Sequence, residues 1–382
     1  MLFYYKYFDE TLFSFDLQTQ INDNNVCKID AESIDGEMVK RFLPLEFCGE
    51  LSEERLVKWL KHRMIPANRY YVKNFLSRLG LAENDICGII SVSYGLSLND
   101  CYWLRPETEN RTFAQLNLYD NRFSTVLGAI AFTGYGSYLK TGFRSSPEFT
   151  TNGMLAKAWR RLDGKILLYK SGTVGAANTG LEPYSEFYAY QVAKAMEINA
   201  IPYGLSKWKG CLCSTCELFT SKELSFVPAG NIIKFKDINT FIGYYKQELG
   251  DKFYEALIDM FVFDAIILNQ DRHLGNFGFM VDNQTNKIVA PAPIFDNGLS
   301  LFCYAMDDDI AHYKKYAKTI IPALYPDFMK LASQIITHRQ RTMLQRLINF
   351  HFKKHPRYNL PDSRLEFLSM WVRERAKALL KP

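Results

Sequence analysis

The chain has 382 residues, of which 48% are hydrophobic and 23% are charged, and its formal net charge is +5. This length favours two or three structural units, and the composition is that of a folded protein and excludes a largely disordered one. The charge does not by itself indicate a nucleic-acid-binding protein, because such proteins concentrate Lys and Arg on one surface.

Neither a secretory signal nor a membrane span is expected. The N-terminal segment has no basic run followed by an apolar core, and no stretch approaches the roughly 18 apolar residues that indicate a span. The most apolar candidate, 256–268, contains Asp259 and Asp264. We therefore expect a cytoplasmic protein that contacts neither a membrane nor, directly, a nucleic acid.

Residues 1–140 begin with an aromatic-rich segment typical of strands, and helical patterns follow it. Ser52 followed by Glu53 is typical of a capped helix start, and a second helix is expected over 69–79. No catalytic constellation occurs in this region, so its role stays open. The segment 128–153 is rich in Gly, Ser and Thr, which indicates a domain boundary.

A β-hairpin is predicted next. Asp163-Gly164 is typical of a two-residue turn, and it separates two strand-like segments. Lys170 falls on the apolar face of the second strand, because side chains alternate along a strand. A helix is expected over 185–196.

Two later features have plain interpretations. Cys211, Cys213 and Cys216 form a C-x-C-x-x-C cluster, but a zinc site needs a fourth ligand and none is evident, so ordinary strand cysteines are preferred. The segment 328–350 predicts an amphipathic helix pair. Its basic residues around Arg339 are interpreted as a solvated face and not as a nucleic-acid contact.

The pattern that indicates chemistry is Leu268-Asn-Gln-Asp-Arg-His-Leu-Gly-Asn-Phe-Gly-Phe-Met-Val281. An apolar helix precedes it, and a hairpin follows it before Ile294-Phe-Asp-Asn-Gly298. This order brings the side chains of Asp271, Asn276 and Asp296 to one mouth.

These three groups fit phosphoryl transfer. One carboxylate orients the attacking hydroxyl, while an Asn and a second Asp hold Mg²⁺ on the triphosphate. Protein kinases use this order: Asp, four residues, Asn, a hairpin, then Asp-x-Gly. The sequence therefore predicts an ATP- and Mg²⁺-dependent phosphotransferase with Asp271 as catalytic residue and Asn276 and Asp296 as metal ligands. His273 is expected to brace the catalytic loop.

The run Asp271-Arg-His-Leu-Gly-Asn276, with Phe295-Asp296-Asn-Gly-Leu-Ser300, resembles the HipA-like serine/threonine kinases, including relatives of the CtkA type. The resemblance is best over about 145–350. It implies an α+β, two-lobed protein kinase-like fold, with a β-rich N-lobe over 141–222, a helical C-lobe over 223–382 and an additional N-terminal α/β region over 1–140.

The resemblance also implies roles for residues outside the motif. Lys170 would contact the ATP α- and β-phosphates and pair with Glu186, for which Glu182 is a rival. Backbone groups of Glu217 and Phe219 would hydrogen-bond adenine.

The phosphate-covering loop departs from the usual pattern, because no G-x-G-x-x-G precedes Lys170. Thr150-Thr151-Asn152-Gly153 is the preferred candidate, in place of Gly134-Tyr-Gly136, which lies too far upstream. HipA-like kinases regulate themselves by phosphorylation in this loop, which makes Ser146, Thr150 and Thr151 candidate autophosphorylation sites.

The preferred hypothesis is a protein serine/threonine kinase that transfers the γ-phosphate of ATP to a protein hydroxyl and autophosphorylates. The resemblance also raises a toxin–antitoxin role with an antitoxin-like protein partner. The rival hypotheses are a lipid or small-molecule kinase, since D-R-H-x-x-N also occurs in phosphoinositide kinases, and an ATP-binding pseudokinase or scaffold.

Overall fold

The computed structural model describes residues 1–19, 25–137 and 143–381. The predicted boundary at 140/141 therefore lies outside the described residues. The chain divides into two compact units. Unit 1 comprises Met1–Lys170, Glu217–Val227 and Met280–Val289, and unit 2 comprises Ser171–Cys216, Pro228–Phe279 and Ala290–Pro382.

Unit 1 begins with an antiparallel sheet in the order β3-β2-β1-β4. Its strands are β1 (Leu2–Tyr7), β2 (Glu10–Thr19), β3 (Asn25–Ile29) and β4 (Tyr102–Pro106). Aromatic residues paired across these strands are fully buried, as Tyr5 and Phe13 show. Helices α1 (Gly36–Phe42), α2 (Glu53–His62) and α4 (Ile86–Ser93) pack against the sheet. Ser52 caps α2 through its hydroxyl, which confirms the predicted helix start.

A second core of unit 1 lies beside this sheet domain. It is built by α3 (Val72–Ser77), α6 (Thr125–Thr133) and the short turn at Pro147–Phe149. The predicted helix over 69–79 is thus present but shorter, because Arg69 bonds carbonyl groups of a neighbouring segment and does not enter the helix. A short helix, α5 (Phe113–Leu116), precedes α6.

The predicted hairpin is confirmed as β5 (Lys157–Leu162) and β6 (Lys165–Ser171). Asp163 and Gly164 both have positive φ, at 49° and 76°, which is the requirement of a type I′ turn. A two-residue turn fixes the register between β5 and β6. In this register Lys157 lies opposite Lys170.

A three-stranded sheet has the order β11-β10-β9 and most of its residues belong to unit 1. Its strands are β9 (Leu224–Pro228), β10 (Gly278–Asp282) and β11 (Lys287–Pro291). The last two confirm the hairpin predicted after the catalytic motif.

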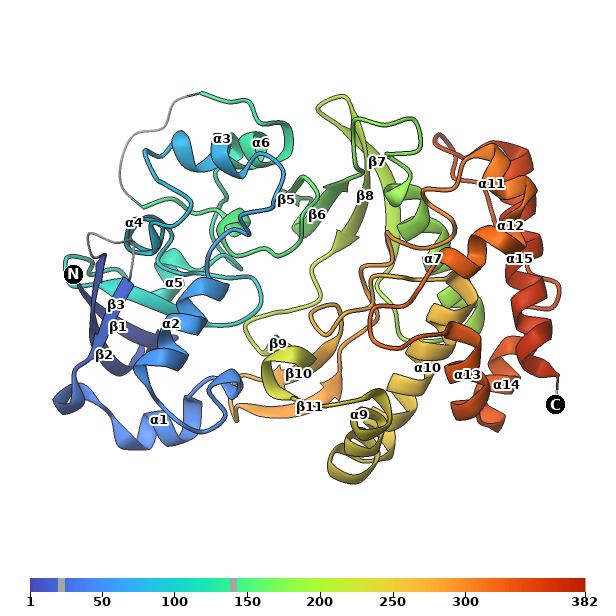
Figure 1. Ribbon diagram of the computed structural model, residues 1–382. Helices are drawn as coiled ribbons and strands as arrows, with labels where there is room; N and C mark the ends of the chain where they lie inside the picture. Colours follow the sequence, from blue (N-terminus) through green and yellow to red (C-terminus); the bar gives the residue numbers. More distant parts are fainter. Residues whose placement is uncertain (20–24, 138–142, 382) are drawn as a thin grey trace. The chain divides into compact units, whose positions relative to one another are not determined.

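Unit 2 is mainly helical, with one hairpin of β7 (Tyr203–Trp208) and β8 (Cys211–Glu217). Its central helix, α10 (Asp251–Ile267), is buried on all sides from Leu257 to its end and contacts α13 and α15, as Figure 1 also shows. The other helices are α7 (Glu182–Met196), α8 (Ala229–Ile232), α9 (Ile238–Tyr244), α11 (Asp307–Ala311), α12 (Tyr313–Tyr316), α13 (Phe328–Ile335), α14 (His338–Gln345) and α15 (Asp362–Leu380).

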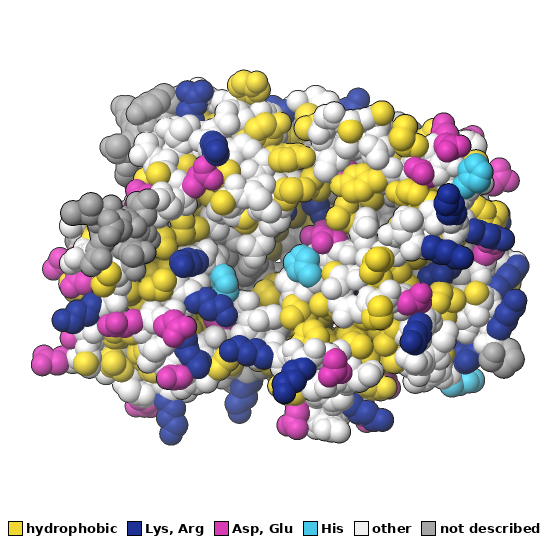
Figure 2. Space-filling view, viewed as in Figure 1, with side chains coloured by type: hydrophobic (Ala, Val, Ile, Leu, Met, Phe, Trp, Pro, Cys, Tyr) yellow, Lys and Arg dark blue, Asp and Glu magenta, His cyan; other side chains and the backbone are white. Residues whose placement is uncertain are grey.

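Two sequence-based interpretations can be compared with these elements. The amphipathic helix pair predicted over 328–350 is confirmed as α13 and α14. Across the part of the chain that the structure describes, no helix is long and apolar enough to cross a membrane. The face shown in Figure 2 carries Asp and Glu side chains among its Lys and Arg side chains, in keeping with the small net charge.

Candidate functional site

The catalytic loop, residues 269–276, begins where α10 ends. Leu268 closes the helix with a φ of 55°, a left-handed conformation that is costly for a non-glycine residue and concentrates at functional sites. The Asn276 Nδ2 donates to the Asp271 carbonyl oxygen at 2.9 Å. This bond links the two predicted functional residues and orients the amide of Asn276, whose oxygen must point away from the bond.

Arg272 is the centre of the polar network around this loop, and its side chain is 1% exposed. Its Nε donates to Asp264 at 2.9 Å, and its Nη1 donates to the carbonyl oxygens of Asn276 at 3.0 Å and Phe295 at 2.6 Å. Arg272 therefore ties the helix, the catalytic loop and the residue before Asp296 together.

Burial raises the pKa of the Asp264 carboxyl, and the neighbouring Arg272 guanidinium opposes that rise. Sequence reasoning missed Arg272. The available signal was Asp264 among the apolar residues at the end of α10, because a buried carboxylate requires a cationic or hydrogen-bonding partner.

Asp296 also lies in a left-handed conformation, with a φ of 54°, which Asp tolerates better than most residues. Its backbone amide donates to the Tyr203 hydroxyl at 3.2 Å, and the amide of Asn297 donates to the Glu186 carboxylate at 2.7 Å. The Arg272 Nη2 donates to the Asn297 side chain at 2.5 Å. The segment that presents Asp296 is thus held from three sides within unit 2.

Glu186 and Glu182 both lie in α7 and are buried, but they have different partners. Glu186 accepts the Asn297 amide, as described above. Glu182 accepts the Thr173 amide at 3.2 Å and the Tyr304 hydroxyl at 2.7 Å. Glu186 is therefore the one of the two that contacts the Asp-Asn-Gly motif. The pairing of Lys170 with Glu186 stays a prediction.

His273 is exposed on the catalytic loop, and its Nδ1 accepts the Gly275 amide at 3.0 Å. Its backbone amide donates to the Asp271 carbonyl at 2.8 Å, and its carbonyl accepts the Asn276 amide at 2.9 Å. These bonds hold the turn between Asp271 and Asn276.

The donor set fits magnesium. Mg²⁺ prefers hard oxygen ligands and keeps several waters, so Asn276 and Asp296 would suffice together with phosphate oxygens. Among the residues that the structure describes, no group of three His, Cys, Asp or Glu side chains could hold a metal ion by itself. Cys211 and Cys213 share one face of β8, and Cys216 falls on the other because side chains alternate.

Unit 1 contains Lys170, which is buried near the end of β6. Its cross-strand partner is Lys157, also buried, whose Nζ donates to the Asn152 carbonyl at 2.5 Å. The two buried lysines thus lie in register, and Lys157 also contacts the candidate phosphate loop through the Asn152 carbonyl. Sequence reasoning missed Lys157, although the register of the Asp163-Gly164 turn would have located it.

The phosphate loop, Thr150 to Gly153, is held by its own unit. The Thr150 hydroxyl donates to the Leu96 carbonyl at 3.1 Å, and the Thr151 hydroxyl donates to the Pro147 carbonyl at 2.7 Å. Arg69 donates to the carbonyls of Thr151 and Gly153. With these hydroxyls and carbonyls engaged, phosphate binding by the loop would depend on its backbone amides.

Residues 217–219 lie at the end of β8, beside β6. The Leu218 amide donates to the Ile166 carbonyl at 2.9 Å. Because backbone hydrogen-bonding groups alternate in direction along an extended chain, we expect those of Glu217 and Phe219 to face away from β6. This is the orientation that adenine recognition by their backbone groups would require.

A separate cavity of about 530 Å³ lies within unit 2. It is lined by residues of α10 and by Phe277 and Ile294, which are close in sequence to Asn276 and Asp296. None of Asp271, Asn276 and Asp296 lines it, so this cavity is not the catalytic site that the motif predicts.

The helices and sheets described above form a mixed α/β architecture, and comparisons with solved structures show which fold it resembles. A chain of the complex of the Shewanella oneidensis MR-1 toxin–antitoxin proteins HipA and HipB with operator DNA matches with a TM-score of 0.55 and 11% identity, covering 98% of this chain and 97% of that chain. The Helicobacter pylori proinflammatory kinase CtkA matches with a TM-score of 0.45 and 18% identity, covering 59% of this chain and 92% of its own.

A scan against protein-family models and a search of curated proteins each found no match. The match to the HipA–HipB complex shows that the chain has a HipA-like kinase fold. The resemblance inferred from the motifs is thus confirmed at the level of the fold.

Proposed function

We propose that this protein is an ATP- and Mg²⁺-dependent serine/threonine protein kinase of HipA type. The observation that supports this most strongly is the Arg272 network, which holds the loop of Asp271 and Asn276 and the segment of Asp296 in one arrangement. Catalysis of phosphoryl transfer depends mainly on positioning and electrostatics, so a rigid arrangement of these residues is what the reaction requires.

Each residue has a role in this proposal. Asp271 orients the attacking hydroxyl and accepts its proton, and Asn276 and Asp296 hold the metal. Bound Mg²⁺ would neutralise charge on the β- and γ-phosphates. Lys170 and Lys157 bind phosphate oxygens, and the phosphate loop covers them.

The remaining residues orient this machinery. Backbone groups of Glu217 and Phe219 bind adenine. Glu186 holds the Asn297 amide and pairs with Lys170, and His273 keeps the catalytic loop in its turn.

Transfer of labelled γ-phosphate from ATP–Mg²⁺ to the purified protein and to a generic protein substrate tests the proposal. Asp271→Asn and Asp296→Asn should each lose at least about a hundredfold in rate, as removal of a charge-stabilising or proton-accepting group does. Asp308→Asn, at an exposed position of α11, is the matched control and should keep the parent rate. Label on phosphoinositide vesicles but not on protein would support a lipid kinase, and ATP binding without transfer would support a pseudokinase.

We also propose autophosphorylation in the segment that leads into the phosphate loop. Ser146 is buried, and its hydroxyl donates to the Glu148 carboxylate at 2.5 Å. A phosphate on Ser146 would lie against that carboxylate, so phosphorylation requires the segment to leave its present position. Mass spectrometry after ATP treatment tests this, and absence of phosphate on Ser146, Thr150 and Thr151 would contradict it.

An antitoxin-like protein partner is a further part of the proposal, supported by the match over 98% of this chain to the complex with HipB. Growth arrest on expression of the parent chain, absent with Asp271→Asn, would indicate toxin activity that depends on phosphotransfer. Arrest by both variants would contradict a kinase toxin.

A further inference from the structure

The segment from Gly95 to Asp100, here called the strut, joins α4 to β4 in unit 1. It is not a surface loop, because Gly95, Leu96, Ser97 and Leu98 are all buried. Tyr94 and Gly95 have φ values of 53° and 60°, so the chain turns sharply out of α4 before the strut begins. A buried irregular segment needs partners for its backbone groups, and those partners show what the strut does.

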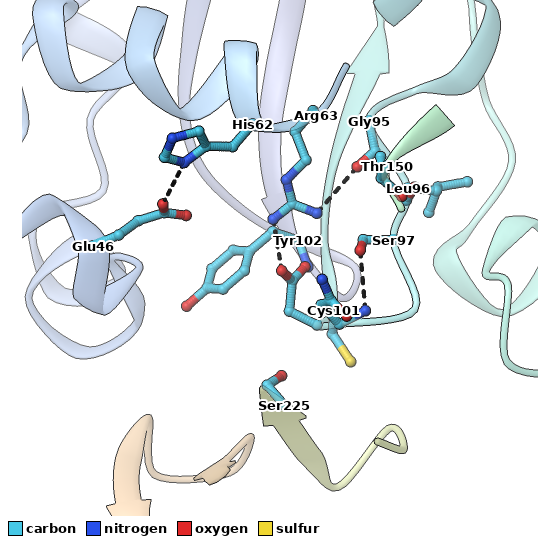
Figure 3. Close-up of polar contacts among 12 residues, drawn as sticks. Glu46, His62, Arg63, Gly95, Leu96, Ser97, Cys101, Tyr102, Thr150 and Ser225 are labelled. Carbon is cyan, nitrogen blue, oxygen red and sulfur yellow. Dashed lines mark hydrogen bonds and ion pairs between the residues drawn. The ribbon is translucent and has the colours of Figure 1, made fainter. Parts of the chain in front are cut away.

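Arg63, at the end of α2, ties both ends of the strut (Figure 3). Its Nη1 donates to the Gly95 carbonyl at 3.3 Å, and its Nη2 donates to the Asp100 carboxylate at 2.7 Å. The Arg63 side chain is 5% exposed and its guanidinium stacks on Trp59 at 4.0 Å. Asp100 also accepts the Tyr102 amide at 3.0 Å, which joins the strut to β4. The strut is therefore anchored to the core of the N-terminal sheet.

Two carbonyl groups of the strut accept hydroxyls from the segments assigned to the nucleotide. Leu96 accepts the Thr150 hydroxyl at 3.1 Å, at the start of the phosphate loop. Leu98 accepts the hydroxyl of Thr220, the residue after Phe219, and that of Tyr119 at 3.0 Å. In addition, the Asn99 carbonyl accepts the amide of Phe226, whose ring packs edge-on against Phe219 at 5.5 Å.

We propose that the strut sets the spacing between the phosphate loop and the adenine-binding segment, so that this part of the N-terminal region supports the ATP site. Thr150 and Thr220 are positioning residues in this proposal: their hydroxyls face the strut, and their neighbours contact the nucleotide. The inference rests on the proposed kinase function. It assigns a role to the N-terminal region, which the motifs leave without one.

The proposal predicts a particular kinetic signature. The strut contacts segments that bind ATP in the ground state and the transition state alike, whereas the groups that act only in the transition state lie in unit 2. Loss of a strut contact should therefore raise KM for ATP and leave kcat nearly unchanged, as loss of uniform binding does. If the strut had a purely structural role, loss of a contact would lower stability without raising KM selectively over kcat.

The experiment measures the Kd of ATP–Mg²⁺ by calorimetry, and KM and kcat for transfer, in Thr150→Val and Thr220→Val. Each variant should raise Kd and KM about fivefold to tenfold, in the upper part of the range of one hydrogen bond, with kcat within about twofold of the parent. The Thr150→Ser and Thr220→Ser variants keep the hydroxyl and should restore Kd to within about twofold of the parent.

Thr133→Val is the matched control, because the Thr133 hydroxyl also donates to a backbone carbonyl, but to that of Ala129 in α6 and not to one of the strut. It should cost a similar amount of thermal stability and leave Kd unchanged. If a Val variant does not fold, the Ala variant at the same position replaces it, with the same expected rise in Kd.

The outcomes separate the strut from the kinase proposal. Parent-like Kd in both Val variants, or a fall in kcat at unchanged KM, would overturn the role of the strut while the kinase function stands. Failure of the parent chain to bind ATP–Mg²⁺ at all would overturn both.

Discussion

The catalytic loop of unit 2 and the phosphate loop of unit 1 are held by different kinds of contact. Arg272 and Asp264, which hold the catalytic loop, are eight residues apart in the chain. The phosphate loop is held by partners much further away, since Thr150 and Leu96 are 54 residues apart and Arg69 and Gly153 are 84 apart. The catalytic loop is thus built mainly by its neighbours in sequence, and the phosphate loop by tertiary packing.

This difference has an energetic side. The Arg272–Asp264 pair is fully buried, so its charges are paired at the cost of desolvation, and breaking it leaves an uncompensated charge. The phosphate loop is held mainly by hydroxyl and side-chain bonds to backbone carbonyls, each of modest net value. The catalytic loop should therefore resist motion more than the phosphate loop does.

The largest effect is expected from Arg272→Met. The substitution leaves Asp264 buried without its cation and should lower the free energy of unfolding by about 3–5 kcal/mol. Phosphotransfer should be lost as well, because Asn276 and Phe295 lose their common donor. Urea unfolding and the labelled-phosphate assay measure the two effects.

A second pair on the same helix gives the control. Arg339 bonds Asp259 at 2.8 Å, but its side chain is 48% exposed and Gln340 also donates to Asp259. Arg339→Met should cost less stability and leave transfer unchanged. Equal losses in the two variants would show that the Arg272 network has no special relation to the site.

The next largest effect is expected from Arg63→Lys, which tests the long-range contacts of unit 1. A lysine keeps the charge beside Asp100. Its single ammonium group cannot also reach the Gly95 carbonyl as the two-pronged guanidinium does, and it does not stack on Trp59. We expect a loss of about 1–3 kcal/mol in unfolding free energy, the cost of an unmet buried group, with a raised Kd for ATP–Mg²⁺. Lost stability at a parent-like Kd would mean that the strut supports the fold but not the nucleotide site.

A smaller and pH-dependent effect is expected from Glu148→Gln. Burial raises the pKa of the Glu148 carboxyl above its ordinary value of 4.5, with the Ser146 and Trp159 hydrogen bonds opposing the rise. The folded state therefore holds this proton more tightly than the unfolded state, and the stability that it contributes is lost as the pH rises from about 4.5 through the folded pKa.

Glutamine has no proton to lose, so the stability of Glu148→Gln relative to the parent should increase as the pH rises over this range. Urea midpoints at a series of pH values from 4.5 upward measure the trend. A constant difference between the two proteins would contradict the raised pKa.

The same contrast explains what could be predicted from the sequence. The hairpins at Asp163-Gly164 and after Phe277, and the cap at Ser52, follow from local rules of turn and helix chemistry. The order of Asp271, Asn276 and Asp296 along the chain indicated a kinase-like fold because each lies at a defined place relative to a helix or a hairpin.

The strut could not be predicted in this way. Nothing in Gly95 to Asp100 indicates that its carbonyls accept the hydroxyls of Thr150 and Thr220, since the second of these bonds joins residues 122 positions apart. Arg69 was expected within a helix because its residue type allows it, but its bonds to the phosphate loop decide its place. Contacts of this kind depend on the packing of the whole unit.

The smallest effect is expected from Lys165→Ala. The Lys165 Nζ lies 2.7 Å from the Glu217 carboxylate, but both side chains are more than half exposed. Such a pair contributes only about 0–1 kcal/mol, because solvent screens it and ordering two long side chains opposes it. The backbone of the adenine-binding segment is held by Leu218 and Thr220 instead, so the Kd of ATP–Mg²⁺ should stay within about twofold of the parent, which is less than one hydrogen bond is worth. A tenfold rise in Kd for Lys165→Ala, measured beside Thr220→Val, would show that the surface pair and not the strut positions this segment.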